Sequence, residues 1–434
     1  MTSPFLEDLD ARGLIADATD ELGAHLASGS RTLYVGFDPT SDSLHVGSLL
    51  PLLALRRAQL AGHRPIVLVG GGTGLIGDPS GKTGERVLNP TAVVHAWAER
   101  LKRQVSPFLD FECGRLSAVL TDNYEWISKL DVVSFLRDVG KHFSLGAMLA
   151  KESVRARLGR ADSGVSYTEF SYQVLQAYDF LCLLGRLDCT VQMGGSDQWG
   201  NITAGIELIR RVEGRAGFGL TLPLVTKTDG SKFGKTESGT VWLDPARTSA
   251  YEMYQFWLNA ADGDVVRFLK YFTFLPLAEI EDLARLTERQ PEKREAQRVL
   301  GREITTLVHG AEAAREAERT AVAVFQGERL DEIEAGSLDG GALPGAFIHA
   351  SEPRFLWSIL KEAGIVASAS EARRLISQGG VAVNGHRVPG IEFKLGEGQY
   401  LVQIGKRRFW RVLVGPEYET RPWQEQARKA IDGA

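Results

Sequence analysis

The sequence predicts an α/β fold in which a parallel-sheet domain is followed by an α-helical domain and a small α+β domain. Short β-branched runs ending in glycine alternate with helical patterns in the first half of the chain. Helical periodicity dominates from residue 248, and a basic segment with a hairpin signal follows it. At 434 residues the chain is long enough for two or three domains.

The parallel sheet is predicted from two strand patterns that enclose a helical one. Residues 31–37 ("RTLYVGF") and 64–70 ("RPIVLVG") are typical of buried parallel strands. Between them, residues 45–60 have apolar positions at helical spacing, and Asp42 and Ser43 precede them as expected N-caps. Such a βαβ unit binds ligands beyond the carboxyl ends of its strands, beside helix N-termini.

A second unit of this kind is predicted at residues 189–201 ("CTVQMGGSDQWGN"), where a strand pattern runs into glycines and then into an apolar helical pattern. Residues 326–350 are rich in glycine and predict a linker. Asn384 and Gly385 suit a type I′ hairpin turn. We expect a catalytic domain, a loop with connector, a helical domain, a linker, a basic domain and a tail at residues 1–228, 229–247, 248–325, 326–350, 351–415 and 416–434.

Charge and composition limit the function classes. The net charge is -5 and the isoelectric point is near 6.0, which argues against a uniformly basic nucleic-acid-binding surface. Residues 351–415 hold ten Lys or Arg against five Glu, a local charge of +5, so the rest of the chain carries -10. A small basic domain is therefore attached to an acidic body.

Cysteine content and the amino terminus bear on location. The three cysteines are an odd number without a C-x-x-C spacing, which suits a reducing compartment and predicts neither a disulfide frame nor a zinc site. The amino terminus has acidic residues and no apolar signal-peptide core, and no run of 18 apolar residues occurs. We expect a soluble cytoplasmic protein with no membrane partner and no dedicated metal site.

Residues 76–86 ("IGDPSGKTGER") resemble a P-loop but do not fit one. The pattern requires a glycine four residues before Gly81, and Ile76 stands there instead. Pro79 has no backbone N–H to offer a phosphate, and Asp78 adds a negative charge. A P-loop hydrolase remains an alternative, and ATP hydrolysis without any amino acid would be its mark.

Three other segments are candidates for chemistry. Residues 38–47 ("DPTSDSLHVG") lie between a predicted strand and a helix N-terminus, where a polyphosphate is favoured. Lys232 and Lys235 lie in a glycine-bracketed loop that could bring two ammonium groups onto developing negative charge. Tyr172, Gln176 and Asp179 fall on one face of a helical pattern and suit an amino acid's ammonium or hydroxyl group.

Each of these segments has a structural alternative when it is taken alone. A helix-start histidine can be a surface residue, a Gly/Lys/Ser stretch can be a solvated turn, and a polar helix face can be an internally paired network. Their order in one chain decides between the alternatives. "HVGS" at 45–48 and "KFGKT" at 232–236 match the HIGH and KMSKS signatures, with "YVGFDPT", "GGTGLIGDPS", "FSYQVLQAYDF" and "GGSDQWGN" beside them. Along nearly its whole length the chain resembles bacterial tyrosyl-tRNA synthetases, which are class I aminoacyl-tRNA synthetases.

The resemblance implies a Rossmann-like catalytic domain, a helical anticodon-side domain and an S4-like RNA-binding domain. It implies ATP-dependent activation of L-tyrosine, with ATP as a substrate accompanied by Mg²⁺ and no tightly bound cofactor, then transfer of the tyrosyl group to tRNA(Tyr). It also implies a homodimer. In-line attack of a carboxylate on the α-phosphate needs positioning and charge stabilisation rather than a covalent nucleophile.

The resemblance also assigns roles to individual residues. The catalytic set, which would contact the leaving polyphosphate, is Thr40, His45, Lys82, Arg86, Lys232 and Lys235. The tyrosine set is Tyr34 and Asp179 for the phenol, Asp78, Tyr172 and Gln176 for the ammonium group, and Gln198 near the carboxylate. The ATP set is Asp38, Gly47, Ser48, Gly195, Asp197 and Lys235. The RNA set is Arg373, Arg374, Lys406, Arg407 and Arg408.

Two positions depart from the family pattern. Ser48 stands where the HIGH signature ends in histidine, and Val35 stands where some family members have cysteine. In the family both side chains can reach the ribose, so the departures bear on nucleotide affinity. The alternatives to a tyrosine enzyme are a tryptophanyl-tRNA synthetase, which shares the class I core but does not usually carry the S4-like domain, and a catalytically inactive RNA-binding paralogue.

Overall fold

The computed structural model describes residues 3–80, 88–149, 166–228, 233–236, 239–326, 345–350, 352–405 and 408–415. The chain forms two compact units. The first comprises Met1–Asp244 and Val266–Asp282, and the second comprises Pro245–Val265 and Leu283–Ala434. None of the described helices combines the length and apolar character needed to cross a membrane.

The first unit is built on a six-stranded sheet with the order β1-β6-β5-β2-β3-β4. Only β1 is antiparallel to its neighbour. The direction of the crossovers reverses between β2 and β5, which is where open α/β sheets bind ligands. The strands are β1 (Asp17–Ala18), β2 (Thr32–Phe37), β3 (Arg64–Val69), β4 (Val119–Asp122), β5 (Cys189–Gly195) and β6 (Phe218–Leu222).

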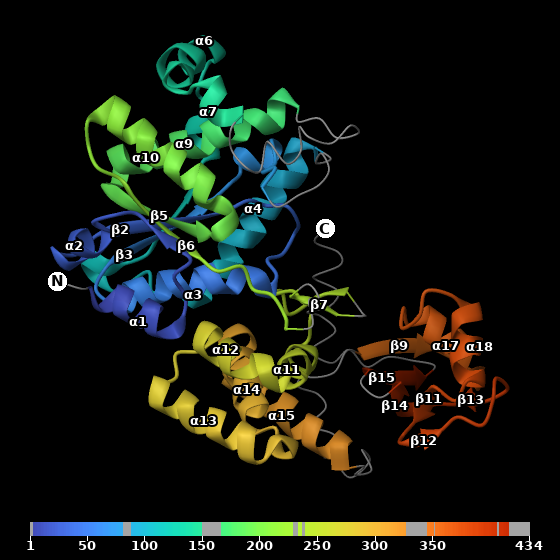
Figure 1. Cartoon of the computed structure of the whole chain (residues 1–434). Helices are drawn as coiled ribbons and strands as arrows, with labels where there is room; N and C mark the ends of the chain where they lie inside the picture. Colours follow the sequence, from blue (N-terminus) through green and yellow to red (C-terminus); the bar gives the residue numbers. More distant parts are fainter. Residues whose placement is uncertain are drawn as a thin grey trace. The chain divides into compact units, whose positions relative to one another are not determined.

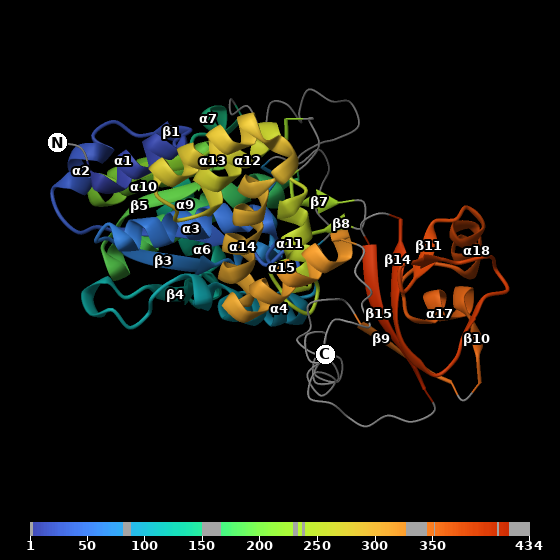
Figure 2. The same ribbon diagram turned by 90° about the horizontal axis from the view of Figure 1, so that it is seen from below.

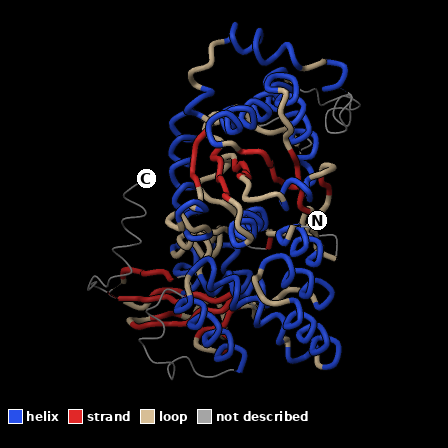
Figure 3. The backbone as a smooth tube through the Cα atoms, turned by 90° about the vertical axis from the view of Figure 1, so that its left-hand side faces the viewer, coloured by secondary structure: helices blue, strands red, loops and turns tan. Residues whose placement is uncertain are grey.

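Helices cover both faces of this sheet. Helix α3 (Val46–Leu60) packs on one face, and α9 (Tyr167–Leu187) and α10 (Trp199–Glu213) pack on the other (Figure 1, with strands in red in Figure 3). Side chains in β2 and β3 such as Leu33 and Val67 are fully buried, as expected for strands covered on both faces. Both βαβ units predicted from the sequence are confirmed.

The predicted N-caps of α3 are wrong. The helix begins at Val46, so the N-cap is His45, whose Nδ1 accepts a hydrogen bond from the Gly47 N–H at 2.9 Å. The Asp42 carboxylate instead pairs with Arg100 at 3.2 Å. The Ser43 hydroxyl donates to the Leu44 carbonyl oxygen at 2.8 Å. Both side chains therefore stabilise the loop before the helix.

The first unit also contains further helices and a small hairpin. The helices are α1 (Pro4–Arg12), α2 (Leu22–Ala27), α4 (Thr91–Val105), α5 (Tyr124–Ile127), α6 (Val132–Ser134) and α7 (Leu145–Leu149), and the hairpin is β7 (Lys235–Thr236) with β8 (Gly239–Thr240). Buried Arg57 in α3 donates to Asp8 in α1 at 2.9 Å, which ties these two helices together.

The helical segment begins with a capping box, in which Ser249 and Glu252 exchange hydrogen bonds at the start of α11. Helices α11 (Ala250–Leu258), α14 (Glu295–His309) and α15 (Ala311–Gln326) pack together in the second unit. Helices α12 (Asp262–Phe272) and α13 (Leu277–Arg289) each belong partly to both compact units, because residues 266–282 are part of the first unit.

The carboxyl-terminal module has a five-stranded sheet of order β12-β11-β14-β15-β9, and two helices pack on one of its faces (Figure 2). The predicted Asn384–Gly385 turn is confirmed, with φ of 48° and 77°. The elements are β9 (Gly345–His349), β10 (Arg354–Phe355), α17 (Leu356–Glu362), α18 (Ala369–Ser377), β11 (Val381–Val383), β12 (His386–Arg387), β13 (Lys394–Leu395), β14 (Gly398–Ile404) and β15 (Arg408–Gly415).

One part of the predicted linker is a strand. Residues 345–349 form β9, which pairs in parallel with β15. Its apolar residue Ile348 is 1% exposed in the module core, so the strand is stabilised by burial that the glycine-rich composition before it does not reveal. The linker and domain boundaries otherwise stay a proposal.

Candidate active site

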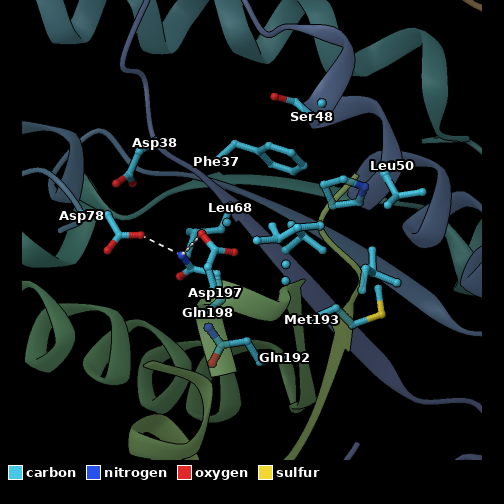
Figure 4. A pocket seen from close by; sticks show the side chains of 18 of the residues that line it. Phe37, Asp38, Ser48, Leu50, Leu68, Asp78, Gln192, Met193, Asp197 and Gln198 are labelled. Carbon is cyan, nitrogen blue, oxygen red and sulfur yellow. Dashed lines mark hydrogen bonds between the residues drawn. The ribbon is translucent and has the colours of Figure 1, made fainter. Parts of the chain in front are cut away.

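A cavity of about 610 Å³ opens at the carboxyl ends of β2 and β5, at the switch point of the sheet. Figure 4 shows side chains from both strands and from the loops beyond them around this space. Twelve residues predicted from the sequence line it: Tyr34, Asp38, His45, Gly47, Ser48, Asp78, Tyr172, Gln176, Asp179, Gly195, Asp197 and Gln198.

The buried end of the cavity holds a carboxylate bound by two donors. Asp179 on α9 is 2% exposed. Trp126 Nε1 donates to its Oδ1 at 2.7 Å, and Asn123 Nδ2 donates to its Oδ2 at 2.8 Å. Burial raises the pKa of Asp179 to about 8, although the two hydrogen bonds act in the opposite direction. The carboxyl group is therefore held in place by two donors and, without a ligand, keeps its own proton at neutral pH.

Tyr34 and Gln192 are neighbours in register on β2 and β5, and both line the cavity. Among the described residues, nothing pairs with the Tyr34 hydroxyl or with Gln192 Oε1, although both atoms are buried. A buried polar atom without a partner lowers stability by roughly 1–3 kcal/mol. A ligand that forms hydrogen bonds with these two atoms would remove that cost. Burial, followed by the nearby Asp179, raises the pKa of Tyr34 well above its ordinary value, so its hydroxyl keeps its proton.

A hydrogen-bond chain joins Asp38 at the end of β2 to this buried end. The Tyr172 hydroxyl donates to Asp38 Oδ2 at 2.7 Å, and Thr73 Oγ1 donates to Asp38 Oδ1 at 2.7 Å. Asn123 Nδ2 donates to Thr73 Oγ1 at 2.8 Å as well as to Asp179. The two carboxylates are thus positioned by one continuous network.

Glycines after β3 make room for this network. An added Cβ at Gly70 would lie 2.0 Å from Asp38 Oδ1, and one at Gly71 would lie 2.4 Å from Asp122 Oδ1. The Gly72 N–H donates to Asn123 Oδ1 at 2.7 Å, which fixes the amide that holds Asp179. The glycine run therefore serves close approach of polar side chains to the backbone.

A second polar group lies across the cavity. Gln198 Nε2 donates to Asp78 Oδ2 at 2.8 Å, as drawn in Figure 4. Asn201 Nδ2 donates to Gln176 Oε1 at 3.0 Å and to Gln198 Oε1 at 3.2 Å. The Ser80 N–H donates to the other Asp78 oxygen at 2.9 Å. An anionic group bordered by amides and by the Tyr172 hydroxyl can bind an ammonium ion.

His45 lies at the amino terminus of α3, where the helix dipole favours a bound anion. Its Nδ1 accepts from the Gly47 N–H, so the proton of the neutral ring is on Nε2. Residues on either side of His45 are fixed to the 241–243 segment, because Val46 N donates to Val241 O at 3.1 Å and Leu243 N to Leu44 O at 2.8 Å. The imidazole is therefore a positioned donor in the lining of the cavity.

The described part of the "KFGKT" loop begins with an aromatic anchor. Phe233 lines the cavity and stacks on Phe272 at 5.5 Å between ring centroids, with Phe268 at 5.3 Å. Next to it, the Val241 N–H donates to the Gly234 carbonyl at 3.0 Å, and Lys235 lies in β7. The described part of the loop is therefore attached through Phe233 and Gly234.

Of the rest of the predicted catalytic set, Thr40 is the residue whose side chain the structure describes, and it is not among the residues that line the cavity. Thr40 is exposed, and its N–H donates to the Asp38 carbonyl oxygen at 2.9 Å. Lys82, Arg86 and Lys232 lie outside the described residues, and only the backbone of Lys235 is described.

Comparison with known families identifies the family of this chain. Residues 27–326 match the class I tRNA synthetases (W and Y), and residues 356–399 match the S4 domain. The chain belongs to the class I tRNA synthetase family. The resemblance inferred from the sequence is thereby confirmed, together with the parallel-sheet fold and the S4 domain.

Relatives of this synthetase are named tyrosine–tRNA ligases. That of Desulfitobacterium hafniense is 56% identical over 391 residues, covering 88% of this chain and 91% of the relative. That of Bacillus caldotenax is 52% identical over 422 residues, covering 94% and 99%. A truncated mitochondrial tyrosyl-tRNA synthetase of Aspergillus nidulans is similar in structure, with a TM-score of 0.68, 31% identity and coverage of 74% and 94%.

Sequence reasoning missed four residues of the synthetase site: Thr73, Asn123, Trp126 and Gln192. Thr73 follows β3, which was predicted, so a signal was present in the polar residue after that strand. Asn123 and Trp126 follow β4, a strand that was not predicted from the sequence. Gln192 lies inside an apolar strand, and its polarity there is the available signal. Thr73, Asn123 and Trp126 act through hydrogen bonds to residues far away in sequence.

The predicted RNA-binding residues are only partly described. Arg373 and Arg374 are exposed on α18 of the S4 domain. Lys406 and Arg407 lie outside the described residues, and of Arg408 only the backbone is described, at the start of β15.

Proposed function

We propose that the chain is a cytoplasmic tyrosine–tRNA ligase, which activates L-tyrosine with ATP and transfers the tyrosyl group to tRNA(Tyr). The observation that carries the choice of amino acid is the buried Tyr34 hydroxyl beside the buried Asp179 carboxyl group. A substrate phenol can donate to Asp179 and accept from Tyr34. An indole N–H can only donate, and phenylalanine can do neither, so both leave Tyr34 unpaired.

The amino group of tyrosine would bind at the second polar group of the cavity. Asp78 supplies the negative charge, and Tyr172 and Gln176 supply oxygen acceptors from α9. Gln198, which donates to Asp78, would lie near the carboxylate of the substrate. Binding both ends of the amino acid fixes the carboxylate for attack, which is the positioning that this reaction requires.

In the first step, a carboxylate oxygen of tyrosine forms a bond to the α-phosphorus of ATP. The bond from that phosphorus to the oxygen bridging to the β-phosphate breaks, and pyrophosphate leaves with Mg²⁺ that arrived with the nucleotide. The products are tyrosyl-adenylate and pyrophosphate. No proton has to be removed from the nucleophile, so no general base is needed.

The catalytic residues would stabilise the charge that moves onto pyrophosphate. His45 can donate from Nε2 at the amino terminus of α3, and Thr40 is expected beside it. Lys232 and Lys235, with Lys82 and Arg86, would close over the same phosphates from two loops.

The nucleotide would bind at the carboxyl ends of the strands of the sheet. Asp38, Gly47, Ser48, Gly195 and Asp197 are our assignment for adenosine and its ribose. Asp197 and Gly195 are adjacent, since an added Cβ at Gly195 would lie 2.6 Å from Asp197 Oδ1. Glycine at position 195 therefore leaves room for the Asp197 carboxylate beside the backbone.

In the second step, a ribose hydroxyl oxygen at the acceptor end of tRNA forms a bond to the carbonyl carbon of the adenylate. The bond from that carbon to the phosphate oxygen breaks, AMP leaves, and the hydroxyl proton passes to the departing phosphate or to water. The S4 domain is proposed to hold the tRNA elsewhere, through Arg373, Arg374, Lys406, Arg407 and Arg408. The helical segment is proposed to face the anticodon side.

Pyrophosphate exchange across the twenty amino acids tests this function. We expect exchange with tyrosine and little with tryptophan or phenylalanine. Tryptophan-dependent exchange would establish the rival tryptophanyl enzyme. Absence of exchange together with intact RNA binding would establish an inactive paralogue, and ATP hydrolysis without amino acid would establish a hydrolase.

We also propose that the synthetase acts as a homodimer. Support comes from large apolar side chains exposed on α6, α7 and the start of α9: Val132 71%, Val133 71%, Leu145 66% and Tyr167 72%. Exposure of such a group in water is costly unless another surface covers it. Sedimentation of wild type and of a Val132→Glu/Val133→Glu variant tests this, and an unchanged dimer in the variant would exclude this surface.

A further inference from the structure

The S4 domain carries a stack in which two cations and two aromatic rings alternate. The Arg373 guanidinium lies 3.9 Å from the centre of the Trp357 ring. Trp357 stacks on Phe355, with centroids 5.8 Å apart and planes inclined by 18°. The Lys394 ammonium lies 4.5 Å from the centre of the Phe355 ring. We call these four residues the cation–aromatic stack.

Each member is fixed by a different element of the domain. Phe355 in β10 and Lys394 in β13 are cross-strand partners. Trp357 lies in the first turn of α17, whose residues Leu356 and Ile359 are fully buried in the core beneath. Arg373 lies on α18, which packs against α17. The fold therefore fixes the backbone positions from which the four side chains meet.

The two cations of the stack are not engaged in ion pairs with any residue that the structure describes. Among the described residues, neither Arg373 nor Lys394 has an ion-pair partner, and both are exposed. Arg354, which is close by in sequence, differs because it pairs with Glu362. Contact with an aromatic face restricts a cation without neutralising it. The stack therefore presents two positive charges whose side-chain freedom is already reduced.

We propose that the cation–aromatic stack is a phosphate-binding face for the backbone of tRNA, with Trp357 and Phe355 as positioning residues and Lys394 as a contact additional to the arginines of α18. The proposal rests on the tyrosine–tRNA ligase function and specifies how its RNA partner is held. Charge complementarity with a polyanion supports it, since the domain is positive within an acidic protein.

The arrangement favours phosphates over bases. Each ring has a cation over it and the other ring against it, so the cations are the groups that the stack presents to a partner. Restricted guanidinium and ammonium groups suit phosphate oxygens, which carry no sequence information. The stack should therefore contribute affinity and salt dependence rather than recognition of particular bases.

The test is equilibrium binding of full-length protein to a tRNA(Tyr) transcript at several salt concentrations. Arg373→Gln and Lys394→Gln should each weaken binding about two- to fivefold and lower the slope of log affinity against log salt by about 1. Trp357→Leu removes no charge, so it should weaken binding about two- to fivefold with little change of slope. Trp357→Phe keeps a ring face and should bind nearly as wild type does.

Lys361→Gln is the matched control, because it removes an exposed charge of the same domain that is not part of the stack. Wild-type affinity of Arg373→Gln and Trp357→Leu would overturn the proposal, as would an equal loss in Lys361→Gln. Circular dichroism of each variant excludes unfolding as the cause. Tyrosine-dependent pyrophosphate exchange by the wild type tests the ligase function separately, so failure of either idea can be recognised.

Discussion

The buried Asp179 carboxyl group predicts a specific dependence of stability on pH in the ligand-free enzyme. Burial raises its pKa from 3.8 to about 8. In that interval the folded protein holds a proton that the unfolded chain has released, so the free energy of unfolding falls as pH rises. Below the unfolded pKa the contribution is complete, and above the folded pKa it is lost.

The size of the effect follows from the shift. Each pH unit between the two pKa values changes the free energy of unfolding by about 1.4 kcal/mol. Between about pH 5 and about pH 8, Asp179 should therefore remove about 3–4 kcal/mol of stability from the wild type. Asp179→Asn cannot ionise, so its unfolding curve should lack this decrease.

Urea unfolding followed by tryptophan fluorescence measures the difference, since Trp126 donates directly to Asp179 at 2.7 Å. The amide introduced by Asp179→Asn also meets the Asn123 and Trp126 donors, so we expect a destabilisation that is the same at every pH. The carboxyl group is tested only by how the difference in the free energy of unfolding between wild type and variant changes with pH. Parallel wild-type and variant profiles between these pH values would refute the reasoning.

Four further outcomes follow from the site. Tyr34→Phe should weaken tyrosine activation about two- to tenfold in pyrophosphate exchange. It should not lower the stability of the ligand-free protein, because the Tyr34 hydroxyl has no partner to lose among the described residues. An unchanged exchange rate would contradict the phenol assignment. His45→Ala should lower the maximal exchange rate by roughly 100-fold, with little change in tyrosine affinity measured by equilibrium dialysis. Phe233→Ala should slow exchange because the loop loses its contacts with Phe268 and Phe272, whereas Leu224→Ala at an exposed side chain of the same cavity is the control. Deletion of residues 345–434 should preserve exchange and impair tRNA charging, and equal loss of both would oppose the modular arrangement.

Much of the site was predictable because local periodicity determines which side chains share a helix face. Tyr172, Gln176 and Asp179 are spaced at i, i+4 and i+7, and all three line the cavity. The β-branched and aromatic runs at 31–37 and 64–70 likewise located β2 and β3, since both strands are buried on both faces. The resemblance then connected segments that no local pattern could bring together.

What the sequence could not provide is the pairing of polar groups across long separations. Asp38 is bound by Tyr172, which is 134 residues away, and Asp179 is held by Asn123, which is 56 residues away. Such partners depend on how the chain packs, and any Asn or Asp after a strand has the same local signature. The predicted N-cap of α3 was wrong for a related reason. Asp42, Ser43 and His45 can all serve as caps, and the geometry of the loop before the helix selects His45.

The hydrogen bond between Gly47 and His45 makes the first and third positions of the "HVG" sequence a single unit. An added Cβ at Gly47 would lie 2.6 Å from Cε1 and 2.8 Å from Nδ1 of the imidazole. Even alanine at this position would displace the ring or break the bond that leaves the proton on Nε2. A glycine assigned to the nucleotide therefore also controls the protonation geometry of the histidine, and a substitution made to probe ATP affinity there would alter the catalytic group as well.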